Sequence, residues 1–205
     1  FSVRDIGDRF VKWLRSRPID VGNTCRRGIL RYLHEGTLAA PPNEGDGGNG
    51  AAMRMAPVAI AALGDPALLE RWAIEQAHLT HNHVLSDHAC LLLGRLLQQA
   101  CTGRSREHMR RQLEPMFEAF PTFRFTPYRA LATTYVVDTV QTVLHYFFAT
   151  RTFEDCLVAT VNQGGDADTT GAIVGALAGA YYGLEAIPTR WTKKLDPELV
   201  RELTR

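Results

Sequence analysis

Four glycines recur at every fourth residue in an apolar stretch toward the end of the sequence. Gly171, Gly175, Gly179 and Gly183 are separated only by Ala, Ile, Val, Leu and Tyr. Residues four apart lie on one face of a helix, so the spacing predicts a helix with a stripe of glycines. Each helical glycine costs about 1 kcal/mol relative to alanine, so the stripe predicts a buried helix that another backbone approaches closely. The run is shorter than the roughly 20 apolar residues that span a bilayer, which favours a core helix.

The residues that lead into this helix carry oxygen ligands at close spacing. Residues 162–171 read Asn-Gln-Gly-Gly-Asp-Ala-Asp-Thr-Thr-Gly and place Asp166, Asp168 and Thr169 in a glycine-flanked turn. Mg²⁺ and Mn²⁺ prefer oxygen ligands, and two aspartates one residue apart on irregular backbone can converge on one ion or straddle two. The alternative is a capping cluster, because Asp and Thr commonly begin helices.

Two further motifs accompany this turn. Residues 47–54 read Gly-Gly-Asn-Gly-Ala-Ala-Met-Arg, and residues 135–141 read Tyr-Val-Val-Asp-Thr-Val-Gln. Together with the turn and the small-residue helix after it, they resemble the ADP-ribosylglycohydrolase family. The motifs occur in the family's order, and they cover most of the chain.

The resemblance implies a metal-dependent hydrolase that removes ADP-ribose from an arginine side chain of a target protein. The N-glycosidic bond would be cleaved at a dinuclear Mn²⁺ or Mg²⁺ site, and in the members that look most similar the target is dinitrogenase reductase. Asp166, Asp168 and Thr169 match the positions that hold the two ions in the family. Such a site can bind vicinal ribose hydroxyls and lower the pKa of a bridging water.

The same resemblance implies an acidic motif that is not found here. The family's metal centre also uses a Thr-Asp-Asp-Thr-like motif from the N-terminal part of its domain, whereas residues 1–60 contain no adjacent acidic pair. We therefore expect residues 1–205 to form one ADP-ribosylglycohydrolase-like domain without its N-terminal part. Two alternatives remain, a non-catalytic module that binds ADP-ribose and a structural helical domain whose aspartates only cap.

A carboxylic acid is also needed, because cleavage at the anomeric carbon requires protonation of a poor leaving group. Asp20, Glu44 and Asp46 are the candidates. Each has a simpler interpretation as a turn residue or a solvated loop acid. The resemblance favours Asp20 as the catalytic acid, with Asn23 beside it against the ribose. Glu44 and Asp46 are expected to be substrate-binding residues.

The glycine-rich motif is the second expected part of the substrate site. The resemblance implies that the loop of Gly47, Gly48, Asn49 and Gly50 binds the diphosphate or the distal ribose. Glycines let backbone amides approach phosphates closely, although this short pattern alone is a weak signal.

Histidines and one tyrosine complete the candidates. The segment 78–88 contains His78, His81, His83 and His88, which makes a zinc site conceivable, but it lacks a His-Glu-x-x-His pattern and a cysteine pair. The resemblance instead places His81 at the cleft, in contact with ADP-ribose. Tyr135 is expected to face the same cleft, and its alternative is an ordinary core aromatic.

Composition limits the remaining classes of function. The 205 residues are 45% hydrophobic, which suffices for one core, and 23 basic and 22 acidic residues give a formal net charge of +1. This balance provides no overall field for nucleic acid or an anionic membrane, so neither a nucleic-acid partner nor an integral membrane segment is expected. No Cys-x-x-Cys pair and no signal peptide are visible, which favours the cytoplasm. We interpret the scattered cysteines as small core residues: Cys25, Cys90, Cys101 and Cys156.

Periodicity predicts an all-α fold, a single compact orthogonal helical bundle. A long loop of glycine and proline over residues 36–48 is expected to be functional or disordered. Asn23 or Thr24 is expected to cap the second helix, and Asp65 the fourth. The apolar spacing predicts helices over residues 3–14, 24–34, 50–63, 66–79, 84–100, 106–120, 130–149 and 153–161, and another from residue 197.

Overall fold

Helices follow one another along residues 1–203, the part of the chain that the computed structural model describes, and no strand occurs among these residues. The expected all-α class is therefore confirmed. The helices are α1 (Val3–Arg15), α2 (Asn23–Glu35), α3 (Met55–Ala61), α4 (Pro66–His78), α5 (Val84–Cys101), α6 (Arg106–Ala119), α7 (Val136–Ala149), α8 (Phe153–Asn162), α9 (Ala167–Tyr182), α10 (Thr189–Thr192) and α11 (Pro197–Leu203). Short 3-10 turns lie at Glu44–Asp46, Ala52–Arg54, Pro121–Phe123 and Leu184–Ala186.

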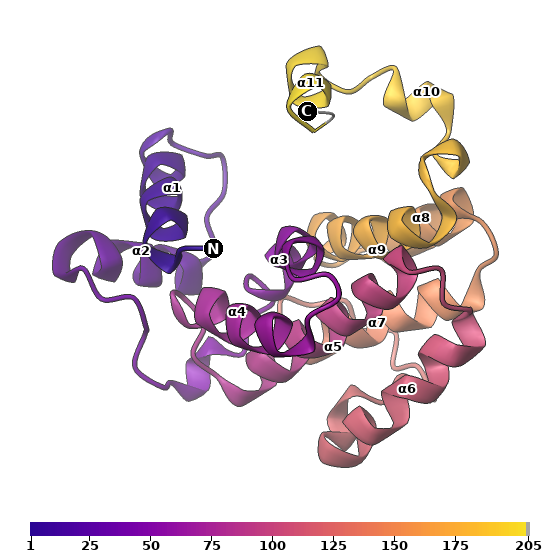
Figure 1. Cartoon of the computed structure of the whole chain (residues 1–205), viewed down its shortest axis with the longest axis horizontal. Coiled ribbons are helices and arrows are strands. Elements are labelled where there is room, and N and C mark those ends of the chain that lie inside the picture. The colour runs from indigo at the N-terminus through magenta and orange to yellow at the C-terminus, as the bar shows by residue number, and fades with distance from the viewer. Residues whose placement is uncertain (204–205) are drawn as a thin grey trace.

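The core lies where α5, α7 and α9 meet. Helix α5 packs against α3, α4, α7 and α9, and α9 packs against α7 and α8 (Figure 1). Apolar side chains at three- and four-residue spacing fill this region, among them Leu93, Val140 and Leu177, each at most 1% exposed. Burying one such side chain contributes about 1.5 to 3 kcal/mol, so these helices form a rigid base for the site.

A smaller apolar cluster joins α1 and α2 at one side of the molecule, away from α8 and α9 (Figure 1). Its buried members are Val11, Ile29, Tyr32 and Leu79. Among residues 1–203, no helix is both long enough and apolar enough to cross a bilayer.

The glycine stripe lies on α9. Gly171, Gly175 and Gly179 face side chains of α8, and a Cβ added to them would lie 3.1, 3.6 and 3.8 Å from Val161, Leu157 and Phe153. The glycines accommodate the bulky side chains of α8, which lets α8 pack closely along α9 as expected. Only the first of these glycines is tightly packed.

The fourth glycine of the stripe is not helical. Gly183 follows the end of α9 with a φ of +82°, a conformation that favours glycine. At its other end α9 begins earlier than predicted, at Ala167. Asp168 and Thr169 thus lie in the first helical turn, and the expectation that both aspartates lie on irregular backbone is wrong.

Other helices also begin at different residues than the sequence predicts. Helix α7 begins at Val136, and residues 130–135 are irregular. The predicted helix over residues 50–63 divides into a 3-10 turn and α3. Gly22 lies at the N-cap of α2 without a side-chain cap, whereas Asp65 does cap α4, accepting from two backbone N–H groups at 3.0 Å. Cys101 is exposed at the end of α5, unlike the expected core cysteine.

Candidate functional site

A tight turn between α8 and α9 positions the aspartates. Gly164 and Gly165 have φ values of +76° and +65°. A Cβ on Gly165 would lie 2.1 Å from the carbonyl oxygen of Ala132, so a larger residue cannot fit without moving the backbone. The backbone N–H of Asp166 donates to the same carbonyl at 2.7 Å. The turn is therefore fixed against residues 130–135.

Asp166 occupies the N-cap of α9, but its side chain does not cap the helix. One of its oxygens, Oδ2, instead accepts from Asn49 Nδ2 at 2.6 Å. Hydrogen bonding with Asp166, followed by hydrogen bonding with the backbone of Thr169, lowers the pKa of the Asp168 carboxyl. This use of the Asp166 side chain argues against the interpretation that the aspartates are only caps.

The glycine-rich motif meets the other two motifs at this point. Gly48 pairs with Tyr135 in an isolated antiparallel bridge, and Val136 donates its N–H to the Gly47 carbonyl at 2.9 Å. Asn49 donates its backbone N–H to Thr134 at 3.0 Å and its side chain to Thr139 Oγ1 at 2.8 Å. The three motifs, separated in sequence, therefore share one hydrogen-bonded network.

His81 lies directly under the glycine loop. A Cβ on Gly48 would lie 3.3 Å from His81 Nε2, and one on Gly50 would lie 2.8 Å from Cε1. Burial, with further contributions from Arg54 and Arg27, lowers the pKa of His81 to about 3. The imidazole is therefore neutral near pH 7, and with 2% of its surface exposed it packs against the inner side of the glycine loop.

The two loop acids have different surroundings. Asp46 is 2% exposed and accepts a hydrogen bond from the guanidinium of Arg27. Glu44 is fully exposed, with a carboxylate oxygen 3.6 Å from His83 Nε2. Asp46 is thus a paired internal acid, whereas Glu44 presents its carboxylate at the surface beside His83.

Tyr135 is 42% exposed, which contradicts its alternative as an ordinary core aromatic. Its ring lies beside Gly47, where an added Cβ would come within 3.3 Å of Tyr135 Cε2. The exposed ring at the edge of the glycine loop fits the expected contact with a ligand.

Asp20 and Asn23 are exposed in the loop before α2 and in its first turn. Within residues 1–203 neither has a side-chain hydrogen bond to the turn that carries Asp166. The first turn of α2 nevertheless lies next to the glycine loop, because a Cβ on Gly50 would be 2.8 Å from Cys25 Sγ. The roles of Asp20 and Asn23 therefore stay predictions.

The histidines of segment 78–88 have separate partners. His78 Nε2 lies 3.0 Å from both carboxylate oxygens of Asp87, and His88 Nε2 lies 3.1 Å from the Met116 carbonyl. Over residues 1–203, no group of three or more His, Cys, Asp and Glu side chains is placed to hold a metal ion. The zinc alternative therefore has no support in the geometry.

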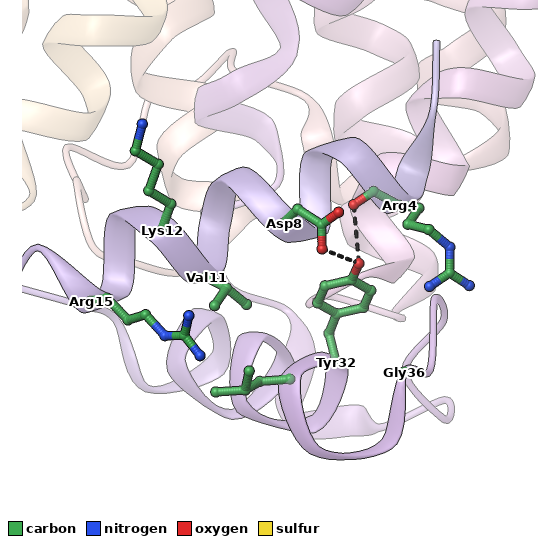
Figure 2. Close-up of a pocket in the computed structure, with 8 residues that line it drawn as sticks. Arg4, Asp8, Val11, Lys12, Arg15, Tyr32 and Gly36 are labelled. Carbon is green, nitrogen blue, oxygen red and sulfur yellow. Dashed lines mark hydrogen bonds between the residues drawn. The ribbon is translucent and has the colours of Figure 1, made fainter.

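Cavities lie beside α1. One of about 500 Å³ separates α1 from α2, and Figure 2 shows the Tyr32 hydroxyl within it, 2.7 Å from Asp8 Oδ1 and 3.1 Å from the Arg4 carbonyl. The side chains of Arg4 and Lys12 point in different directions, so they do not converge on one ligand (Figure 2). Another, mostly apolar cavity of about 340 Å³ includes Cys25 in its lining. Neither is lined by the aspartates of the turn after α8.

The donor chemistry of the turn fits a hard divalent cation. Asp166, Asp168 and Thr169 offer carboxylate and hydroxyl oxygens, the ligands that Mg²⁺ and Mn²⁺ prefer. Asn49 donates to a single oxygen of Asp166, Oδ2. These three residues would supply part of a coordination shell.

Some parts of this network were not expected from the sequence. Thr139 lies within the motif at 135–141, so its place in that motif was an available signal. The carbonyl oxygens of Ala132 and Thr134 carry no side-chain signal, and only the irregular backbone before α7 brings them to the site.

Residues 1–205 match the family model described as ADP-ribosylglycohydrolase. The chain belongs to the ADP-ribosylglycohydrolase family. A solved structure described as an ADP-ribosylglycohydrolase-related protein complex matches this chain with a TM-score of 0.86 and 36% identity, covering 99% of this chain and 72% of that one. The expected family, its fold and the expected class of enzyme are confirmed.

Relatives within the ADP-ribosylglycohydrolase family include bacterial proteins. The chain is 56% identical to the ADP-ribosyl-[dinitrogen reductase] glycohydrolase of Rhodospirillum rubrum over 204 residues, which are 100% of this chain and 69% of that protein. It is 28% identical to the ADP-ribosylarginine hydrolase Tri1 of Pseudomonas putida, over 95% of this chain and 57% of that protein. The chain therefore spans part of the length of each relative.

Proposed function

We propose that this chain belongs to an enzyme that removes ADP-ribose from an arginine side chain of a target protein, dinitrogenase reductase in the first instance. The relative that is 56% identical acts, by its name, on ADP-ribosylated dinitrogen reductase, and a more distant one on ADP-ribosylarginine. The observation that carries the proposal is the hydrogen bond between Asn49 and Asp166, which unites the glycine loop with the aspartates. A reducing cytoplasm suits the four free cysteines and forms part of the proposal.

In the proposed dinuclear site, Asp166, Asp168 and Thr169 would contribute ligands to a pair of divalent cations, Mn²⁺ or Mg²⁺. When bound, such ions supply positive charge to the ribose hydroxyls and activate a water.

The remaining residues would bind and orient ADP-ribose. Exposed Tyr135 lies beside the glycine loop and can stack on a ring of the ligand, whereas buried His81 would support that loop from inside. Exposed Asp20, near the start of α2, would give a proton to the nitrogen of the departing guanidine.

The direct test supplies the natural protein, at its natural length, with an arginine-ADP-ribosylated protein and saturating Mn²⁺. Release of free ADP-ribose, measured by chromatography, is the expected result. Absence of release would contradict the proposed reaction. Calorimetry with ADP-ribose then separates the alternatives, because binding without release identifies a binding module, and neither binding nor release leaves only a structural domain.

A further inference from the structure

Asn49 uses both of its side-chain N–H bonds within the protein. Nδ2 donates to Asp166 Oδ2 at 2.6 Å and to Thr139 Oγ1 at 2.8 Å. An amide nitrogen carries two hydrogens, so this side chain has no donor left for a ligand. Its backbone N–H is also used, by the Thr134 carbonyl. With 7% of its surface exposed, Asn49 has little area that faces a ligand.

The orientation of the amide follows from its partners. The Asp166 carboxylate can only accept, and the Thr139 hydroxyl donates to the Thr133 carbonyl at 3.1 Å, so it too accepts from Asn49. A rotated amide would place its oxygen against an acceptor at both contacts. The hydrogen-bond pattern therefore fixes one orientation, and Thr139 anchors it.

Asp166 is held at two points by residues distant in sequence. Its backbone N–H donates to the Ala132 carbonyl at 2.7 Å, and its Oδ2 accepts from Asn49. With these two contacts made, the direction of Oδ1 is determined. Groups that orient a metal ligand in this way tune the affinity for the ion without touching it.

We propose that Asn49 is a positioning residue for Asp166 and does not bind ADP-ribose itself. The proposal rests on the proposed function, in which Asp166 is a ligand of a divalent cation. It replaces the substrate-binding role that the sequence predicts for Asn49, while the glycines on either side keep theirs. Thr139 acts through Asn49 and is the second positioning residue.

The test measures affinity for Mn²⁺ and affinity for ADP-ribose separately, by calorimetry, in the natural protein and in Asn49→Ala. We expect the variant to bind Mn²⁺ about 10- to 100-fold more weakly, the range seen when partners of metal ligands are removed. Affinity for ADP-ribose at saturating Mn²⁺ should stay unchanged. At saturating Mn²⁺ the variant should also recover most of kcat, with KM unaffected, which a general structural defect would not allow.

Thr139→Val provides an isosteric second variant, which carries the test if Asn49→Ala does not fold. It should weaken Mn²⁺ binding less than Asn49→Ala does, because the amide keeps its bond to Asp166. In the double variant the loss should not exceed that of Asn49→Ala alone, since Thr139 acts only through the amide. Additive losses would overturn the role assigned to Thr139.

Two results would overturn the role of Asn49: unchanged Mn²⁺ affinity in the folded variants, or a loss of ADP-ribose affinity with Mn²⁺ affinity retained. A natural protein that binds no Mn²⁺ and releases no ADP-ribose contradicts the proposed function itself, and the positioning role with it. A natural protein that does both, beside an Asn49→Ala variant with unaltered Mn²⁺ affinity, contradicts the positioning role alone.

Discussion

The imidazole of His81 packs against the backbone of Gly50 so closely that a Cβ there would lie 2.8 Å from Cε1. On the other side of the ring, Thr80 Oγ1 lies 2.7 Å from Nδ1 and accepts from Arg54 at 2.9 Å. Protonation would bring a second positive charge into this enclosed region. The pKa of His81 is accordingly lowered from 6.5 to about 3, mainly by burial.

This arrangement predicts a pH-dependent contribution of His81 to stability. The unfolded chain takes up a proton on His81 below about pH 6.5, whereas the folded chain resists it down to about 3. The unfolded state thus binds more protons, so the free energy of unfolding falls as pH drops through this window, by up to about 1.4 kcal/mol per pH unit. His81→Gln cannot take up that proton. The stability advantage of the natural protein over the variant should therefore shrink by about 2 kcal/mol between about pH 7 and pH 5.

Urea unfolding at several pH values measures this difference. His34→Gln is the matched control, because His34 is exposed on α2. Its curve should run parallel to that of the natural protein. A His81→Gln curve that is also parallel would show that His81 is protonated equally in both states.

Helix ends were predictable where the signal is local. Asp65 followed by proline marks the start of α4, and Gly36, with a φ of +69°, marks the end of α2. The start of α7 was not predictable, because residues 130–135 read as helical but use their carbonyls for distant partners. Ala132 and Thr134 bind Asp166 and Asn49, whose positions only the folded chain determines.

The candidate site was predictable as a set of residues but not as a network. The motifs identified Asp166, Asp168 and Asn49, yet the bond between Asn49 and Asp166 joins residues 117 apart in sequence. Spacing carries information about one helix face or one turn, and it carries none about such a contact. The sequence therefore predicted a ligand contact for Asn49 where the structure shows a contact with an aspartate.

The turn after α8 offers a second test through its two adjacent glycines. Both have positive φ, so replacing either with alanine should cost about 1 to 2 kcal/mol. At Gly164 no atom lies within 4 Å of the added Cβ, whereas at Gly165 it would lie 2.1 Å from the Ala132 carbonyl oxygen. We expect Gly165→Ala to cost about 2 kcal/mol more than Gly164→Ala. Equal losses in chemical denaturation would show that the Ala132 segment yields freely.

The pair of Arg27 and Asp46 provides a third prediction. Arg27→Met removes the guanidinium that accompanies a carboxylate only 3% exposed, and should cost about 1 to 3 kcal/mol. Arg26→Met is the control, since that neighbouring side chain is exposed and its loss should stay within about 0.5 kcal/mol. Adding Asp46→Asn to Arg27→Met should cost less than Asp46→Asn does alone, because the neutral amide no longer leaves a charge unpaired. Additive losses in urea unfolding would contradict the pairing.

Replacing Asp168 should lower the activity of the enzyme while leaving its stability almost unchanged. Its side chain is exposed in the first turn of α9, so Asp168→Asn should change the unfolding free energy by only about 0.5 kcal/mol. Loss of one ligand carboxylate should nevertheless lower kcat/KM for ADP-ribose release by about 100-fold or more, since the ions supply several kcal/mol of transition-state stabilisation. Asp155→Asn is the matched control, because Asp155 is also an exposed acid in the first turn of a helix, α8. If Asp155→Asn keeps full activity and Asp168→Asn loses it, the loss is specific to the site. If Asp168→Asn stays active, Asp168 is not a ligand of the cation.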